Sequence, residues 1–175
     1  MNLYLAGMIG SGKTTIGQEL SRRTERPFVD LDQEMDRRLG YSFHRLVQEA
    51  GWVPFRELEY SICKYFSALS GTIVCLGGGT VRYEWNLDAI AGSGPIVLLE
   101  AREEVLIERV RLADRPRVNP DTDLAGDIHR MWTEHADRYR SAADHIIRTD
   151  NRTLDEEVAD LLEIIDRSGG FDRVL

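Results

Sequence analysis

The chain has 175 residues, of which 42% are hydrophobic and 30% are charged, a composition typical of an ordinary soluble globule. Its length predicts one domain over residues 1–175, large enough to bury a core without disulfide or metal staples. The formal net charge of −8 argues against nucleic acid as the main partner, because a surface that binds a polyanion needs a basic excess. No apolar run approaches the length that spans a bilayer or forms a signal peptide, so we expect a cytoplasmic protein without a membrane partner.

The first predicted strand, Leu3–Ala6, leads into the glycine-rich segment GMIGSGKTT at residues 7–15, which fits the pattern G-x-x-x-x-G-K-[ST]. Its glycines let the backbone curl so that successive N–H groups point at phosphate oxygens. Lys13 adds a charge for the β- and γ-phosphates, and the Thr14 hydroxyl can ligate a bridging Mg²⁺. A predicted helix follows, as this mechanism requires, so we interpret the loop as a nucleoside triphosphate site. The expected nucleotide contacts are Gly10, Ser11, Gly12, Lys13, Thr14 and Thr15.

The second predicted strand, Pro27–Asp30, belongs to the sequence FVDLD, which supplies Asp30 and Asp32. Ligands collect at the carboxyl ends of parallel strands, so both carboxylates should face the phosphate loop. Alternate strand residues share a face, which lets one carboxylate serve a metal while the other meets an acceptor hydroxyl. An alternative makes Asp32 the N-cap of a helix over Gln33–Leu39, a role compatible with catalysis.

A further helix can begin at Pro54, giving Phe55 to about Leu69. It places Arg56 and Glu59 one turn apart, a spacing that a surface ion pair explains adequately. Three consecutive glycines at residues 77–79 follow the third predicted strand, Thr72–Leu76. Their cost in backbone entropy indicates that another molecule approaches the main chain closely.

The last two predicted strands are Pro95–Glu100 and His145–Arg148. Non-alternating apolar runs suit strands covered on both faces, so we predict an α/β fold with a parallel sheet between helices. Between these two strands, the segment Leu112–Leu124 is rich in proline and aspartate, and we interpret it as a lid. The final helix begins with a capping box at Thr153–Glu156 and has an apolar face.

In this order, the motifs resemble those of the shikimate kinase family. The resemblance covers roughly residues 1–165 and rests on the P-loop, Asp-x-Asp, Phe-Arg-x-x-Glu, Gly-Gly-Gly, an Arg-Pro lid and a Tyr-Arg pair. It implies a P-loop, nucleoside-monophosphate-kinase-like three-layer α/β/α fold with a five-stranded parallel sheet. It also implies a substrate-binding insertion at about residues 31–60 and a lid at about 112–124.

The same resemblance implies an ATP- and Mg²⁺-dependent enzyme that transfers the γ-phosphoryl group to the 3-hydroxyl of shikimate in aromatic amino-acid biosynthesis. Lys13 and a lid arginine, Arg115, would be catalytic, and Asp32 would be the candidate base that contacts the attacking hydroxyl. Thr14 would hold Mg²⁺, with Asp30 near the metal through water. The resemblance does not fix the oligomeric state, and we expect a monomer.

The remaining implied contacts divide between the acceptor and the nucleotide. The substrate carboxylate would meet Arg56 and Arg140, because a guanidinium fork matches a carboxylate bidentately. The backbone of Gly77, Gly78 and Gly79 would approach the ring hydroxyls. Arg109 and Arg152 would flank the adenine, and Arg115 would meet the transferring phosphoryl group.

The chain departs from the usual family pattern in three places. Trp52 stands where the family has Glu, Cys75 replaces a small residue, and the lid reads Arg115-Pro-Arg-Val118. Arg117 could substitute for Arg115 if the lid register differs. These changes put the closed packing of the lid and the alignment of Arg109 in question.

Two alternative functions share the P-loop. Another small-molecule kinase on the same scaffold, for instance one for a sugar acid, has no particular need for the constellation of Asp32, Arg56 and Arg140. A nucleotide-binding protein without transfer activity would be expected to have lost Lys13, Asp32 or the lid arginine, and none of these is lost.

Overall fold

The computed structural model describes residues 1–113 and 123–171. Its strands are β1 (Leu3–Ala6), β2 (Phe28–Asp30), β3 (Ile73–Cys75), β4 (Ile96–Glu100) and β5 (His145–Arg148). Its helices are α1 (Lys13–Thr24), α2 (Leu31–Leu39), α3 (Phe43–Ala50), α4 (Trp52–Ser67), α5 (Glu84–Ile90), α6 (Glu103–Ala113), α7 (Leu124–Ala142) and α8 (Leu154–Arg167), with a 3₁₀ turn η1 (Thr80–Arg82). All five predicted strands are confirmed. None of the helices in these ranges is long and apolar enough to cross a membrane.

The five strands form one parallel sheet in the order β2-β3-β1-β4-β5. The central strand β1 pairs with β3 through Leu5 and Cys75 and with β4 through Leu5 and Val97. All carboxyl ends therefore meet along one edge of the sheet, where ligands of open parallel sheets bind. This edge carries the phosphate loop after β1, the aspartates after β2 and the glycines after β3.

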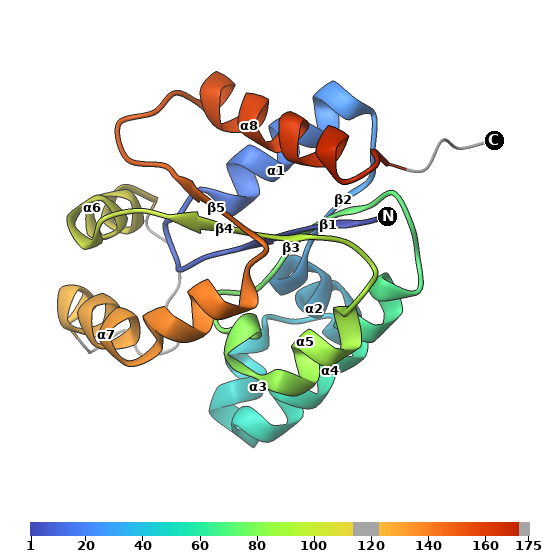
Figure 1. Ribbon diagram of the computed structural model, residues 1–175. Coiled ribbons are helices and arrows are strands. Elements are labelled where there is room, and N and C mark those ends of the chain that lie inside the picture. The colour runs from blue at the N-terminus through green and yellow to red at the C-terminus, as the bar shows by residue number, and fades with distance from the viewer. Residues whose placement is uncertain (114–122, 172–175) are drawn as a thin grey trace.

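Alternate residues of the central strand point into two separate cores. Leu3 and Leu5 pack with α1 and α8 on one face of the sheet. Tyr4 and Ala6 pack with the helices from α2 to α7 on the other face (Figure 1). Since both faces are covered, the apolar runs need no polar alternation, and the predicted three-layer architecture is confirmed.

Two predicted helix starts are wrong. The helix after β2 begins at Leu31, and its N-cap is Asp30 rather than Asp32. The strand passes into the helix without a connecting residue, so the last strand residue is the one that caps. The helix predicted over Phe55–Leu69 runs over Trp52–Ser67, with Pro54 inside its first turn, where a missing N–H costs no hydrogen bond.

Candidate active site

The loop between β1 and α1 is curled by glycines in conformations that other residues rarely adopt. Gly7, Gly10 and Gly12 have φ angles of 147°, 81° and 96°. A Cβ atom on Gly7 would lie 2.6 Å from the carbonyl oxygen of Leu99, so the loop also packs too closely for a side chain. The predicted curl of the loop is therefore confirmed.

Lys13 is the first residue of α1 and folds back over the loop. Its Nζ donates hydrogen bonds to the carbonyl oxygens of Gly7 and Met8 at 2.8 and 3.0 Å. These contacts hold the ammonium group beside the N-terminus of α1, where backbone N–H groups are unpaired. An anion at this position would meet both a cation and the positive end of a helix dipole.

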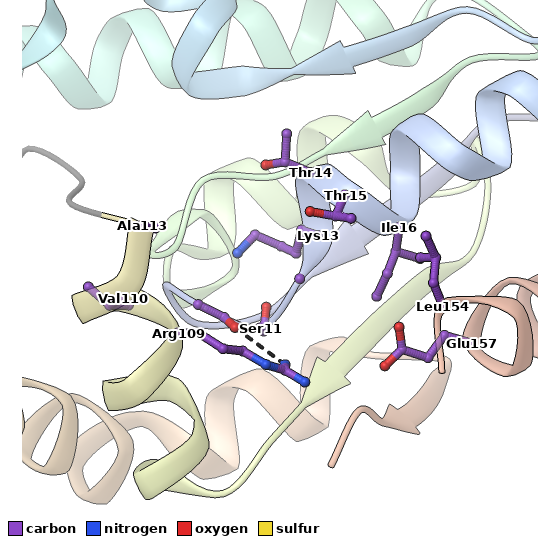
Figure 2. A pocket seen from close by; sticks show the side chains of 12 residues that line it. Ser11, Lys13, Thr14, Thr15, Ile16, Arg109, Val110, Ala113, Leu154 and Glu157 are labelled. Carbon is purple, nitrogen blue, oxygen red and sulfur yellow. Dashed lines mark hydrogen bonds between the residues drawn. The ribbon is translucent and has the colours of Figure 1, made fainter. Parts of the chain in front are cut away.

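A cavity of about 290 Å³ opens along this loop (Figure 2). All six loop residues predicted to contact the nucleotide, from Gly10 to Thr15, line it. α6 adds Arg109, whose guanidinium donates to the hydroxyl and carbonyl oxygens of Thr149 at 3.0 and 2.8 Å. Arg152 is not among the lining residues and instead pairs with Asp160 at 2.6 Å. The structure therefore brings Arg109, but not Arg152, to this cavity.

Two oxygen-bearing side chains meet beside the cavity. The Thr14 hydroxyl donates to Oδ2 of Asp30 at 2.8 Å. The other oxygen of Asp30 accepts from the backbone N–H groups of Asp32 and Gln33. A hydroxyl and a fixed carboxylate fit the oxygen ligands that Mg²⁺ prefers, either directly or through retained water.

Asp32 lies between the phosphate loop and the glycines after β3. A Cβ atom on Gly77 would be 3.0 Å from its Oδ1. Burial raises the pKa of Asp32 to about 6; the negative charge of Asp30 adds to this rise, and Lys13 opposes it. The carboxyl group is thus poised to exchange a proton near neutral pH, as a general base requires.

Arg56 and Glu59 form a buried pair on α4, so the interpretation as a surface ion pair is wrong. Arg56 Nη1 donates to Glu59 Oε2 at 2.8 Å, and the side chain of Glu59 is only 1% exposed. Glu59 also accepts from the hydroxyl of Thr80 at 2.7 Å and from Nδ2 of Asn86 at 2.9 Å. The guanidinium carbon of Arg56 lies 4.3 Å from the centroid of the Tyr83 ring.

The three glycines after β3 differ in what surrounds them, and none has a positive φ. A Cβ on Gly77 or Gly79 would crowd side chains of the chain itself, with Asp32 Oδ1 at 3.0 Å in one case and Arg82 Nη2 at 2.5 Å in the other. Gly78 is open, since a Cβ there would have Ile9 N, at 3.8 Å, as its nearest neighbour. The predicted room for another molecule is therefore left at Gly78.

A model of the shikimate kinase family matches residues 9–166. The chain belongs to the shikimate kinase family. It is 33% identical to the shikimate kinase of Syntrophus aciditrophicus over 92% of this chain and 89% of that protein. It is 34% identical to the shikimate kinase of Chlorobium luteolum over 94% of this chain and 85% of that protein. Family membership establishes an ATP-dependent kinase that acts on a small molecule.

Solved shikimate kinases have the same fold. The enzyme from Bacteroides thetaiotaomicron aligns with a TM-score of 0.86 and 26% identity over 95% of this chain and 98% of that chain. The enzyme from Acinetobacter baumannii, solved in complex with shikimate, aligns with a TM-score of 0.84 and 26% identity over 95% and 93%. A gluconokinase from Sinorhizobium meliloti, at 14% identity and a TM-score of 0.58, shares the fold alone.

Arg140, which the family resemblance places on the substrate carboxylate, has other partners in the structure. Its Nε and Nη2 each donate to the carboxylate of Glu100 at 3.1 Å, and its guanidinium lies over the ring of Trp132. Glu100 ends β4, which lies two strands away from β3 in the sheet. No contact among the described residues joins Arg140 to Arg56.

The lid lies mostly outside the described residues. Its flanks are helical, since α6 extends to Ala113 and α7 begins at Leu124. Arg115 and Arg117 lie outside the described ranges, so the predicted contact with the transferring phosphoryl group stays a prediction.

Glu157 was not identified from the sequence, and it is the charged residue among the unpredicted residues that line this cavity. Glu157 of α8 is buried, and burial raises its pKa, with the charge of Arg109 opposing the rise. It precedes Val158 and stands one turn before Leu161, so it borders the apolar stripe of its helix. The position of this carboxylate beside the apolar stripe is the sequence feature that could have predicted its burial.

Proposed function

We propose that this protein transfers the γ-phosphoryl group of ATP to the 3-hydroxyl of shikimate, giving shikimate 3-phosphate for chorismate biosynthesis. The observation that carries the proposal is the position of Asp32, which faces Lys13 on one side and Gly77, beside Glu59, on the other. A base is thereby placed between the loop assigned to the triphosphate and the residues assigned to the acceptor. We call the latter, which are Arg56, Glu59 and the glycines after β3, the acceptor pocket. A nucleotide-binding protein without transfer activity would leave this juxtaposition without a purpose, and the choice of acceptor below separates shikimate from a sugar acid.

Each assigned residue performs a physical task. Lys13 and the backbone of the loop bind the β- and γ-phosphates and neutralise charge that grows during transfer. Thr14 and Asp30 would hold Mg²⁺, which adds to that neutralisation when bound. Asp32 orients the attacking hydroxyl and takes its proton. Because phosphoryl transfer needs little covalent chemistry from the protein, positioning supplies most of the rate enhancement.

The acceptor is held on the opposite side of Asp32. Arg56 binds the carboxylate of shikimate through its guanidinium fork, which Glu59 orients. The open backbone at Gly78 gives space to the ring. Arg109 lines the cavity assigned to the nucleotide. Arg115 is assigned to the transferring phosphoryl group.

We propose further that the protein acts as a monomer in the cytoplasm, with neither nucleic acid nor a membrane as partner. Every residue assigned to the reaction comes from one chain, so no second copy is required for the chemistry. The net charge of −8 supports small anions bound at local sites rather than a polyanion spread across a surface.

The test is ADP release from Mg·ATP by the purified protein, with shikimate, quinate, gluconate or no acceptor. We expect release with shikimate well above the blank. Arg56→Ala should raise the KM for shikimate roughly 10- to 100-fold, because a charge-assisted contact is lost. Arg56→Lys keeps the charge but loses the fork, so it should recover only part of the affinity.

Arg167→Ala serves as the matched control, since Arg167 pairs with Glu163 on the exposed side of α8. Thermal unfolding of each variant separates a folding defect from a binding defect. If the wild-type protein binds ATP but releases no ADP above the blank with shikimate, the acceptor assignment is wrong. Turnover with gluconate alone would favour the sugar-acid alternative.

A further inference from the structure

Arg82 is a charged side chain beside the triple glycine, and the mechanism above gives it no task. It ends η1, directly after the triple glycine. Its guanidinium folds back on that turn, so that a Cβ on Gly79 would lie 2.5 Å from Arg82 Nη2 and 3.0 Å from its Nε. The missing side chain of Gly79 thus makes room for a guanidinium next to Gly78, where a Cβ would have Ile9 N, at 3.8 Å, as its nearest neighbour.

Arg82 and Arg56 lie close to the same two aromatic residues. Their guanidinium carbons are 5.8 and 4.3 Å from the centroid of the Tyr83 ring. The buried hydroxyl of Tyr139 donates to the carbonyl oxygen of Gly78. Burial raises the pKa of Tyr139 to about 12, and the charges of Arg82 and Arg56 oppose that rise. Two arginines from different elements therefore lie near Tyr83 and Tyr139, and the latter contacts Gly78.

The two guanidinium groups have unused hydrogen-bonding capacity. The Nε atoms of both Arg56 and Arg82 are buried without a hydrogen-bond partner in the part of the chain that the structure describes. Glu59 accepts from Arg56, whereas Arg82 forms no ion pair with any described residue. Buried donors without partners are rare in native proteins and call for an acceptor.

We propose that Arg82 joins Arg56 in binding the carboxylate of the acceptor, the task that the family resemblance assigns to Arg140. The inference rests on the proposed function and names the second half of its carboxylate site. A monoanion would balance the guanidinium charge that Glu59 leaves over, and its two oxygens would accept from both forks. Arg140 is engaged by Glu100 on the far side of β1, so its fork is already occupied.

The experiment measures ADP release at saturating Mg·ATP for the wild-type protein and for Arg82→Ala, Arg82→Lys, Arg140→Ala and the distant control Arg167→Ala. Arg82→Ala is expected to raise the KM for shikimate roughly 10- to 100-fold while changing kcat less than about threefold, because binding is lost rather than chemistry. The KM for ATP should not change. Arg82→Lys should be intermediate, because a point charge replaces a planar fork.

The methyl ester of shikimate gives a second readout that a merely structural role would not move. The wild-type protein should prefer the acid to the ester, and Arg82→Ala should shrink this preference about tenfold, since the ester has no charge to bind. If Arg82→Ala does not fold, the same comparison with Arg82→Lys decides.

The outcomes separate this inference from the function on which it rests. Wild-type turnover of shikimate with an unchanged KM in Arg82→Ala would overturn the role of Arg82 alone. A large rise in KM for Arg140→Ala, with none for Arg82→Ala, would return the task to Arg140. No wild-type turnover of shikimate would refute the proposed function, and the assignment of Arg82 would fall with it.

Discussion

The loop assigned to the phosphates and the residues assigned to the acceptor lie on either side of Asp32. They differ in the groups they offer a ligand, which are mainly backbone N–H groups in the loop and charged side chains on the acceptor side. The loop offers backbone N–H groups, three glycines of positive φ and one lysine, all within nine consecutive residues. The region assigned to the acceptor instead has charged side chains from α4 and η1 around the glycine turn. A backbone site is specified locally, whereas a side-chain site depends on packing between distant segments.

The largest expected effect follows from removing the one cation of the loop. Lys13→Ala should lower kcat/KM about 1000-fold, because a preorganised charge that acts on the transferring group is lost. The fold should persist, since the curl of the loop depends on its glycines. Steady-state ADP release measures the effect, and Lys64→Ala, an exposed lysine of α4, is the control. A loss of less than tenfold would mean that the loop backbone alone supplies most of the stabilisation.

Glu59→Gln tests the buried charges on the acceptor side of Asp32. It should lower the free energy of unfolding by about 3 kcal/mol, because Arg56 would keep a buried charge without its counter-ion. Urea denaturation at pH 7 measures the loss. Glu49→Gln, which removes the carboxylate of an exposed ion pair on α3, should change stability by less than about 0.5 kcal/mol. Equal effects of the two substitutions would contradict the central role of Glu59.

Asp32 belongs to both regions and gives the smallest effect on stability. Its pKa is raised to about 6 in the folded protein, from 3.8, so folding favours the protonated form. The stability linked to this proton is fully present below about pH 4 and is lost as the pH rises through about 6. Asp32→Asn should therefore be more stable than the wild-type protein at pH 7.5, by on the order of 2 kcal/mol.

The gain from Asp32→Asn should vanish by pH 4, while its transfer activity should be strongly reduced at every pH because the base is gone. Urea denaturation at pH 4 and 7.5 measures the first effect and ADP release the second. Asp88→Asn, at an exposed position of α5, should show no pH-dependent difference. A stability gain of the same size at both pH values would rule out the raised pKa as its cause.

The same contrast explains what the sequence allowed us to predict. The strands, the curl of the phosphate loop and the position of Asp30 facing that loop depend on short patterns and on the rule that parallel strands end at one edge. The burial of Glu59 could not be predicted, because its partners Thr80 and Asn86 lie 21 and 27 residues away in the chain.

The position of Arg140 shows the limit of a motif. It follows Tyr139, which does reach the acceptor loop at Gly78. Successive residues of a helix point about 100° apart, so contact by one does not carry its neighbour to the same site. The structure accordingly places Tyr139 against Gly78 and its neighbour Arg140 against Glu100, so the role predicted for Arg140 stays a prediction.

The hydrogen bonds of Glu59 also decide where the acceptor side can bend. They connect α4 to η1 and α5, so we expect α4 not to move as a rigid body together with α2 and α3. The helix α3 is instead flanked by Gly40 and Gly51, which have φ angles of 74° and 83° and no atom within 4 Å of a Cβ position. With an unobstructed glycine on either side of Phe43–Ala50, we expect hinge motion in this region to involve this one helix of eight residues.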